Sequence, residues 1–132
     1  MATWDDVHRL ARALPETEEV ERSWRVRRKP IAWERPLRRG DREALGDTAP
    51  DGDILAARVP DLGAKAALLA DDPEVYFTTP HFDGYPAILV RLERIAEIDL
   101  AELLGEAWLA QAPKRLARAY LDSLGDPTGG TP

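Results

Sequence analysis

The chain has 132 residues, of which 44% are hydrophobic and 32% are charged, and its formal net charge is −6. This length fits one domain, and this composition excludes a disordered protein. The absence of cysteine excludes disulfides, thiolate nucleophiles and zinc–thiolate sites.

The first third of the chain predicts a helix followed by a hairpin. Apolar residues recur at helical spacing over residues 3–14, directly after a good N-cap position at Thr3. Residues 20–26 change to period two, which predicts a half-buried strand. A turn at residues 28–30 then leads into a second strand over residues 31–35.

The middle of the chain predicts a loop, a strand and a second helix. Glycine and proline punctuate a long polar loop over residues 36–53, and residues 54–59 form the third predicted strand. Asp61 is placed to cap the second helix. Its expected inner face consists of Leu62, Ala66, Leu69 and Ala70.

The last part of the chain supplies two strands and a broken helix. Residues 75–78 and 87–92 predict strands on either side of a loop over residues 79–86, and the second strand is apolar enough for a central position. A final helical segment is predicted to begin at a cap on Asp99 and to be interrupted at Pro113.

The predicted order is α-β-β-β-α-β-β-α. Hairpin connections favour a mainly antiparallel five-stranded sheet with helices on one face, an α+β two-layer sandwich. We expect a single domain over residues 1–124 and a flexible C-terminal tail over residues 125–132, which has no core residues. We also expect Trp4, Trp24 and Trp108 to lie in the core, and leave Trp33 open.

Charge is very unevenly distributed along the chain. Residues 22–42 carry a net charge of +7, whereas residues 1–21 carry −4 and residues 43–132 carry −9. A basic hairpin with interleaved tryptophans is typical of a surface that follows a phosphate backbone. The candidate nucleic-acid-binding residues are Arg22, Arg25, Arg27, Arg28, Lys29, Arg35, Arg38, Arg39 and Arg42. The alternative is a solvated strand face whose arginines pair with the acidic remainder.

A second candidate site surrounds His81. His81, Asp83 and Tyr85 lie between two prolines that stiffen the chain, and together with Trp33 they are candidates for the lining of a small-molecule pocket. The alternative is a structural turn, because Asp83 precedes a glycine.

Other chemistry finds no support in the sequence. The two histidines form no helical ligand pair, so no metal site is predicted. Neither a nucleophile elbow nor a phosphate-binding loop is present, so neither a catalytic residue nor a cofactor is predicted. No apolar run is long enough to span a bilayer and no signal peptide is visible, so we expect no membrane partner and a cytoplasmic location.

Several segments resemble the MmcQ/YjbR family of small bacterial proteins. The most specific is Tyr-Phe-Thr-Thr-Pro-His-Phe-Asp-Gly-Tyr-Pro-Ala-Ile-Leu-Val-Arg-Leu at residues 76–92, supported by residues 13–16, 29–33, 107–108 and 112–116. The resemblance implies an α-β(3)-α-β(2)-α fold likened to the frataxin homologue CyaY and to secretion chaperones. It also implies DNA binding through a "double wing" surface, and it implies no enzymatic activity.

We therefore expect a non-enzymatic binding protein, with DNA binding through residues 22–42 as the first hypothesis. A protein-interaction or chaperone-like scaffold domain is the second. A pocket for a small anionic ligand near His81 is the third.

Overall fold

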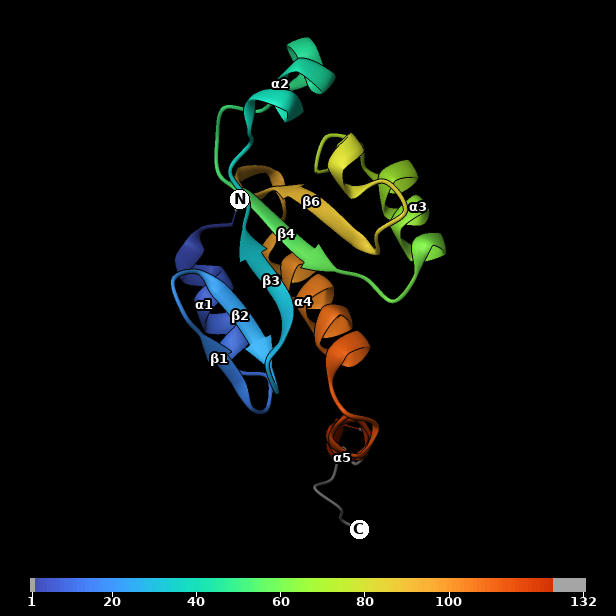
Figure 1. Ribbon diagram of the computed structural model, residues 1–132. Coiled ribbons are helices and arrows are strands. Elements are labelled where there is room, and N and C mark those ends of the chain that lie inside the picture. The colour runs from blue at the N-terminus through green and yellow to red at the C-terminus, as the bar shows by residue number, and fades with distance from the viewer. Residues whose placement is uncertain (1, 125–132) are drawn as a thin grey trace.

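The computed structural model describes residues 2–124, so the predicted tail at residues 125–132 lies outside the described residues. A six-stranded antiparallel sheet, in the order β1-β2-β3-β4-β6-β5, forms the centre of the fold (Figure 1). The α+β class and the antiparallel sheet predicted from the sequence are confirmed, with one strand more than expected.

The N-terminal helix follows its sequence signals closely. Helix α1 (Trp4–Arg12) begins after Thr3, whose side chain accepts a hydrogen bond from the Asp6 backbone N–H, while Asp6 accepts one from the Thr3 N–H. This reciprocal capping satisfies two backbone donors that the first turn of a helix otherwise leaves open. The buried side of α1 consists of Val7 and Ala11.

The predicted strand over residues 20–26 is wrong in its first half. Strand β1 (Thr17–Glu19) ends before Val20, and β2 (Ser23–Val26) begins after a turn in which Glu21 and Arg22 both have positive φ. Val20 therefore lies at a hairpin corner and is 60% exposed, although the period-two pattern placed it inside. A second turn, at residues 27–28, leads into β3 (Lys29–Glu34).

The predicted loop over residues 36–53 contains helix α2 (Arg39–Leu45) and a 3-10 turn at Gly46–Thr48. This helix was not predicted because it depends on a contact with a residue outside it. Asp41 in the first turn of α2 is buried and pairs with Arg35 at the end of β3. This contact fixes a helix that the intrinsic preferences of a Gly-containing segment do not predict.

Helix α3 (Leu62–Asp71) is capped by Asp61 as predicted, but its inner face differs from the prediction. Leu62, Ala66 and Ala70 are exposed, whereas Lys65 is buried, because α3 turns this lysine toward the loop that precedes β6. Leu69 is the one expected inner residue that packs against the core.

The remaining strands and helices match their predictions with small shifts. Strands β4 (Ile54–Arg58), β5 (Tyr76–Phe77) and β6 (Ala87–Arg91) form one end of the sheet, and β6 is paired on both sides. Helix α4 (Glu97–Gln111) begins after Ala96, so Asp99 lies in its first turn rather than at its cap. Helix α5 (Lys114–Leu124) follows directly after Pro113.

The sheet has a large core on one face and a small one on the other. Helix α4 packs on β3 and β4, α1 packs on α4, and the buried Trp24 and Trp108 lie in this larger core (Figure 1). On the opposite face, a 3-10 turn at Pro80–Phe82 covers a smaller apolar cluster. That cluster consists of Ile54, Ala56, Phe77, Phe82, Ala87 and Leu89. The open remainder of this second face carries the candidate site.

Candidate functional site: an aromatic–arginine pocket

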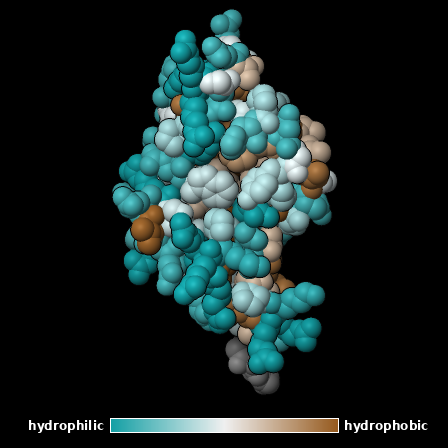
Figure 2. Space-filling view, in the orientation of Figure 1, coloured by the Kyte–Doolittle hydropathy of each residue, from teal (hydrophilic) through white to brown (hydrophobic). Residues whose placement is uncertain are grey.

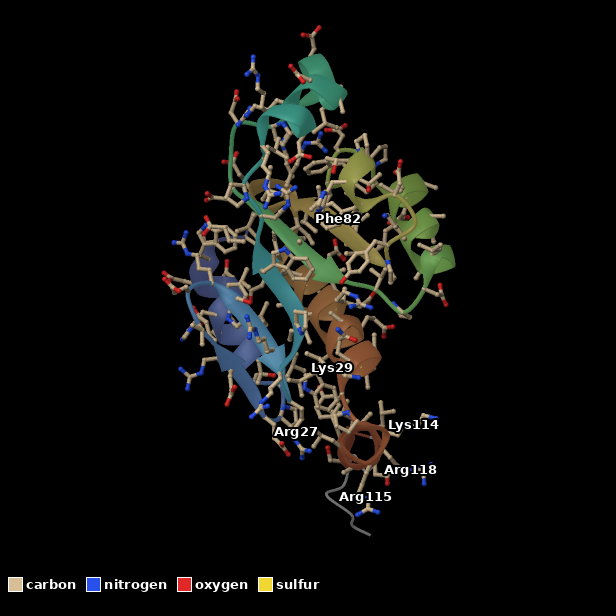
Figure 3. All side chains as sticks on the ribbon, viewed as in Figure 1. Arg27, Lys29, Phe82, Lys114, Arg115 and Arg118 are labelled. Atoms are coloured by element: carbon tan, nitrogen blue, oxygen red, sulfur yellow. The ribbon has the colours of Figure 1, made fainter. Side chains whose placement is uncertain are left out.

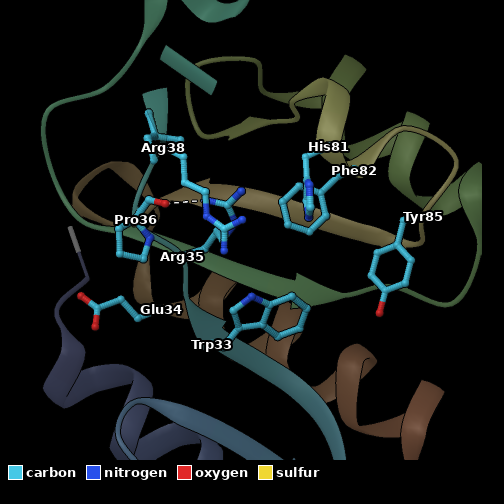
Figure 4. A pocket seen from close by; sticks show the side chains of 9 residues that line it. Trp33, Glu34, Arg35, Pro36, Arg38, His81, Phe82 and Tyr85 are labelled. Carbon is cyan, nitrogen blue, oxygen red and sulfur yellow. Dashed lines mark hydrogen bonds between the residues drawn. The ribbon is translucent and has the colours of Figure 1, made fainter. Parts of the chain in front are cut away.

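A cavity of about 620 Å³ opens on the second face of the sheet, between the end of β3 and the loop that precedes β6. We call it the aromatic–arginine pocket; Figure 4 shows it from close by, and residues of intermediate hydropathy gather at the centre of this face in Figure 2. Its lining consists of Trp33, Glu34, Arg35, Pro36, Leu37, Arg38, His81, Phe82 and Tyr85.

The structure brings together residues from two separate sequence hypotheses. Trp33, His81 and Tyr85 line one pocket as the sequence predicted, and Arg35 and Arg38 from the basic segment line it with them. The expected fourth lining residue, Asp83, is exposed and lies outside the lining, and its carboxylate lies near Lys65 of α3 instead.

Arg35 forms the polar floor of the pocket. Its side chain is 8% exposed, it donates a hydrogen bond to the Pro36 carbonyl, and its guanidinium carbon lies 5.3 Å from the centre of the Phe82 ring. Its Nη2 lies 3.0 Å from Asp41 Oδ2 but has no partner in hydrogen-bond geometry. Nη2 is buried and faces the Asp41 carboxylate, so this nitrogen is charge-paired rather than open to the cavity.

Asp41 holds the arginines in place from below. The Arg38 backbone N–H donates to Asp41 Oδ2 at 2.9 Å, and the Arg35 guanidinium is its ion-pair partner. Burial on its own raises the pKa of Asp41, but the Arg38 backbone N–H and the positive charge of Arg35 outweigh it and leave the pKa below its ordinary value of 3.8. Asp41 is therefore ionised at neutral pH and balances the charge of Arg35, whereas the exposed Arg38 side chain has no carboxylate partner among residues 2–124.

The other wall of the pocket is fixed by Lys65 on α3. Lys65 Nζ donates to the Phe82 carbonyl at 2.6 Å and to the Tyr85 carbonyl at 2.9 Å. Burial lowers the pKa of Lys65, and the nearby Asp83 carboxylate partly offsets this effect. Lys65 thus anchors the segment that presents Phe82 and Tyr85 to the cavity.

Tyr85 is oriented by Arg58 at the end of β4. Arg58 Nη1 donates to the Tyr85 hydroxyl at 3.2 Å, and the Arg58 guanidinium carbon lies 5.0 Å from the centre of the Tyr85 ring. A further positive charge therefore stands beside the outer rim of the pocket. His81, by contrast, makes a T-shaped ring contact with Phe82 and has no carboxylate partner among the described residues.

The nine basic residues of segment 22–42 do not form one continuous ribbon. Arg35 is buried, and α2 lies at the opposite end of the molecule from the turn between β2 and β3 (Figure 1). Five of the nine face a carboxylate: Arg22 with Glu34, Arg27 with Glu16, Arg35 with Asp41, Arg39 with Glu43, and Arg42 with Asp51. The four without such a partner among residues 2–124 are Arg25, Arg28, Lys29 and Arg38.

A different basic cluster forms at the end of the molecule that carries the β2–β3 turn. Gln111 at the end of α4 donates to the Pro30 carbonyl at 2.8 Å, which holds the start of α5 beside this turn. Figure 3 shows bases of the turn and of α5 at the same end. We call this surface the basic end. Figure 3 labels five of its bases, Arg27, Lys29, Lys114, Arg115 and Arg118, and Arg28 follows Arg27 in the same turn.

Sequence reasoning missed three parts of these sites. It assigned Arg35 and Arg38 to a ribbon rather than to the pocket, it did not place Lys65 on the inner face of its helix, and it gave no role to the bases of α5. A partial signal existed only for α5, where Lys114, Arg115 and Arg118 follow one another at helical spacing.

Two kinds of site find no place in the described part of the chain. Within residues 2–124, no group of three or more His, Asp or Glu residues is arranged to hold a metal ion. No helix in the same range is long and apolar enough to cross a bilayer.

Comparison with known proteins finds mycobacterial relatives along nearly the whole chain. The uncharacterized proteins Rv2570 of Mycobacterium tuberculosis (strain ATCC 25618 / H37Rv) and Mb2600 of Mycobacterium bovis are each 60% identical to it over 129 residues, which is 95% of this chain and 100% of each relative. No protein-family model matches the chain, and no solved structure matches it. On this identity and coverage, the chain belongs to the same family as these mycobacterial proteins.

Proposed function

We propose that this protein is a non-enzymatic binding protein whose aromatic–arginine pocket holds a small organic anion with an aromatic body. One observation carries the proposal: Arg35 and Arg38 line the same cavity as Trp33, Phe82 and Tyr85. Aromatic walls provide flat apolar contact area, and guanidinium groups provide charge-assisted hydrogen bonds to a carboxylate or phosphate.

The two arginines have different parts in this proposal. The buried Arg35 is held rigidly by Pro36 and Asp41, so it is preorganised toward an anionic group in the floor. The exposed Arg38 has no carboxylate partner within residues 2–124, so its charge is available without breaking an ion pair there. Binding rather than catalysis is proposed because His81 has no carboxylate in the described chain to orient it as a general base.

Isothermal titration calorimetry with phenyl phosphate as the probe tests the proposal, with benzyl alcohol as an uncharged aromatic comparison. Arg38→Gln should weaken phenyl phosphate binding at least about tenfold, because a charge-assisted hydrogen bond contributes about 1.5–3 kcal/mol. The matched control is Arg39→Gln, which removes the same charge from a neighbouring side chain that is 93% exposed and lies outside the pocket lining. The proposal would be contradicted if Arg38→Gln and Arg39→Gln lost the same affinity for phenyl phosphate. It would also be contradicted if the parent protein bound benzyl alcohol as tightly as phenyl phosphate.

DNA binding is the second candidate, and one observation favours it: the basic end joins bases from the β2–β3 turn and from α5. Only Arg27 of this cluster pairs with a carboxylate among the described residues. Five remaining cations would give a log–log dependence of affinity on salt with a slope of about −4.5. The MmcQ/YjbR resemblance, which we retain as a proposal, adds its DNA-binding label, and the cysteine-free sequence suits a cytoplasmic location.

Fluorescence anisotropy with a labelled duplex at two salt concentrations tests this second candidate. Charge reversal of Lys29 and Arg118 should abolish the signal, because both lie on the basic end. Charge reversal of Arg39 and Arg42 on α2 should leave it within about twofold, since these residues belong to the opposite end of the molecule. The candidate would be ruled out if both charge reversals weakened duplex binding equally, or if the parent protein did not bind the duplex at low salt.

A further inference from the structure

A second cleft, of about 290 Å³, opens between α3 and α4 and shares no residue with the aromatic–arginine pocket. Its walls are partly apolar, with Val59, Leu68 and Leu103 among the lining residues. Its rim is strongly acidic. Five carboxylates line it: Asp71, Asp72, Asp99, Glu102 and Glu106.

The negative charge of this cleft is not balanced from within the described chain. Neither a lysine nor an arginine lines the cleft, and none of its five carboxylates forms an ion pair with a described residue. Asp72 accepts one backbone hydrogen bond, from Glu74 N–H at 3.2 Å. Several like charges around an apolar cleft repel one another and raise the local concentration of cations.

Tyr76 supplies a second and independent observation. Tyr76 lines the cleft and is 7% exposed, and its hydroxyl has no hydrogen-bond partner in residues 2–124. The hydroxyl is not sealed inside the core, so this unpaired phenol oxygen at the wall of the cleft is open to a ligand donor. Burial, together with Asp99, Asp71, Asp72 and Glu102, raises the pKa of Tyr76 to about 12, so the phenol stays neutral and its oxygen can accept a hydrogen bond.

From this combination we infer that the cleft between α3 and α4 binds a small organic cation, an ammonium group carried on a compact apolar body. The apolar walls contact the body of the ligand, the carboxylates attract its charge, and the Tyr76 oxygen accepts one of its N–H donors. The volume limits the ligand to about one aromatic ring with a short chain.

Calorimetric titration with 2-phenylethylammonium tests this inference on the full chain, with 2-phenylethanol and 3-phenylpropionate as neutral and anionic analogues. The cation should bind at least about tenfold more tightly than either analogue. The double variant Asp99→Asn with Glu102→Gln should reduce its affinity at least about tenfold, and Tyr76→Phe should reduce it about threefold.

The matched control is the double variant Glu43→Gln with Asp47→Asn, which removes the same charge from exposed carboxylates outside the cleft. Its affinity for 2-phenylethylammonium should stay within about twofold of the parent protein. If the control loses as much affinity as the cleft variant, or if the alcohol binds as well as the cation, the inference is overturned. Because this cleft and the aromatic–arginine pocket share no residue, either site can fail its test while the other passes.

Discussion

Replacing Asp41 with alanine is expected to lower the free energy of unfolding by about 3–5 kcal/mol, because it leaves the buried Arg35 charge uncompensated. The two side chains are 8% and 7% exposed, and Arg35 Nη2 and Asp41 Oδ2 are 3.0 Å apart. The variant also removes the acceptor of the Arg38 backbone N–H at the start of α2. Urea denaturation followed by circular dichroism measures the change.

Glu43→Ala is the matched control on the same helix. Glu43 is 72% exposed and its carboxylate lies 3.9 Å from Arg39, so this variant should change stability by less than about 0.5 kcal/mol. A loss below about 1 kcal/mol for Asp41→Ala would show that the ion pair does not support the floor of the pocket.

The same pair predicts a dependence of stability on pH. Because the pKa of Asp41 is lower in the folded state than its ordinary value of 3.8, its contribution is fully present above that value and is lost as the pH falls through the lower folded pKa. Asp41→Asn removes this titration. The free energy of unfolding should therefore fall more between pH 5 and pH 3 in the parent protein than in Asp41→Asn. An equal fall in the two proteins would assign the acid sensitivity to other groups.

Replacing Trp108 with alanine is expected to destabilise the fold by about 3–5 kcal/mol, the usual range for removing a buried aromatic side chain. Trp108 is completely buried, its Nε1 donates to the Pro15 carbonyl at 2.9 Å, and its ring contacts Tyr120 of α5. The same variant should loosen α5, and with it the α5 bases of the basic end. Hydrogen exchange of the α5 amides measures this loosening separately from global unfolding.

Leu121→Ala is the control for the Trp108 variant. Leu121 lies on α5 and is 49% exposed, so its loss should cost well under about 1 kcal/mol and leave exchange in α4 unchanged. Similar denaturation midpoints for the two variants would contradict the packing of α5 on the buried Trp108.

The elements that could be predicted are those whose local signals agree with their tertiary environment. Thr3 caps α1, Asp61 caps α3, and Pro113 separates α4 from α5, all as expected. The two-residue turn at residues 21–22 could not be predicted, because it places non-glycine residues at positive φ where Asn-Gly or Asp-Gly is the usual sequence. Because this first turn was missed, β1 was not predicted and residues 20–22 were assigned to a strand. The second turn, predicted at residues 28–30, lies at residues 27–28.

The candidate site could be predicted only in part, for a related reason. Trp33, His81 and Tyr85 were grouped correctly because the implied fold places their segments side by side. The inward position of Arg35 depends on Asp41, which lies in a helix the sequence did not predict. The burial of Lys65 could not be predicted either, because a lysine is buried only where specific acceptors receive its ammonium group. Here the acceptors are two backbone carbonyls of a loop that is distant in sequence.

The binding of an aromatic anion in the aromatic–arginine pocket is tested most directly by two-dimensional ¹⁵N–¹H NMR during titration with phenyl phosphate. The signals of the Trp33 indole N–H and of the Arg35 and Arg38 side chains should shift together with one dissociation constant, while the indole signal of the buried Trp108 stays in place. Shifts confined to Lys29, Lys114 and Arg118 at the basic end, with Trp33 and Arg38 unmoved, would contradict the proposed site.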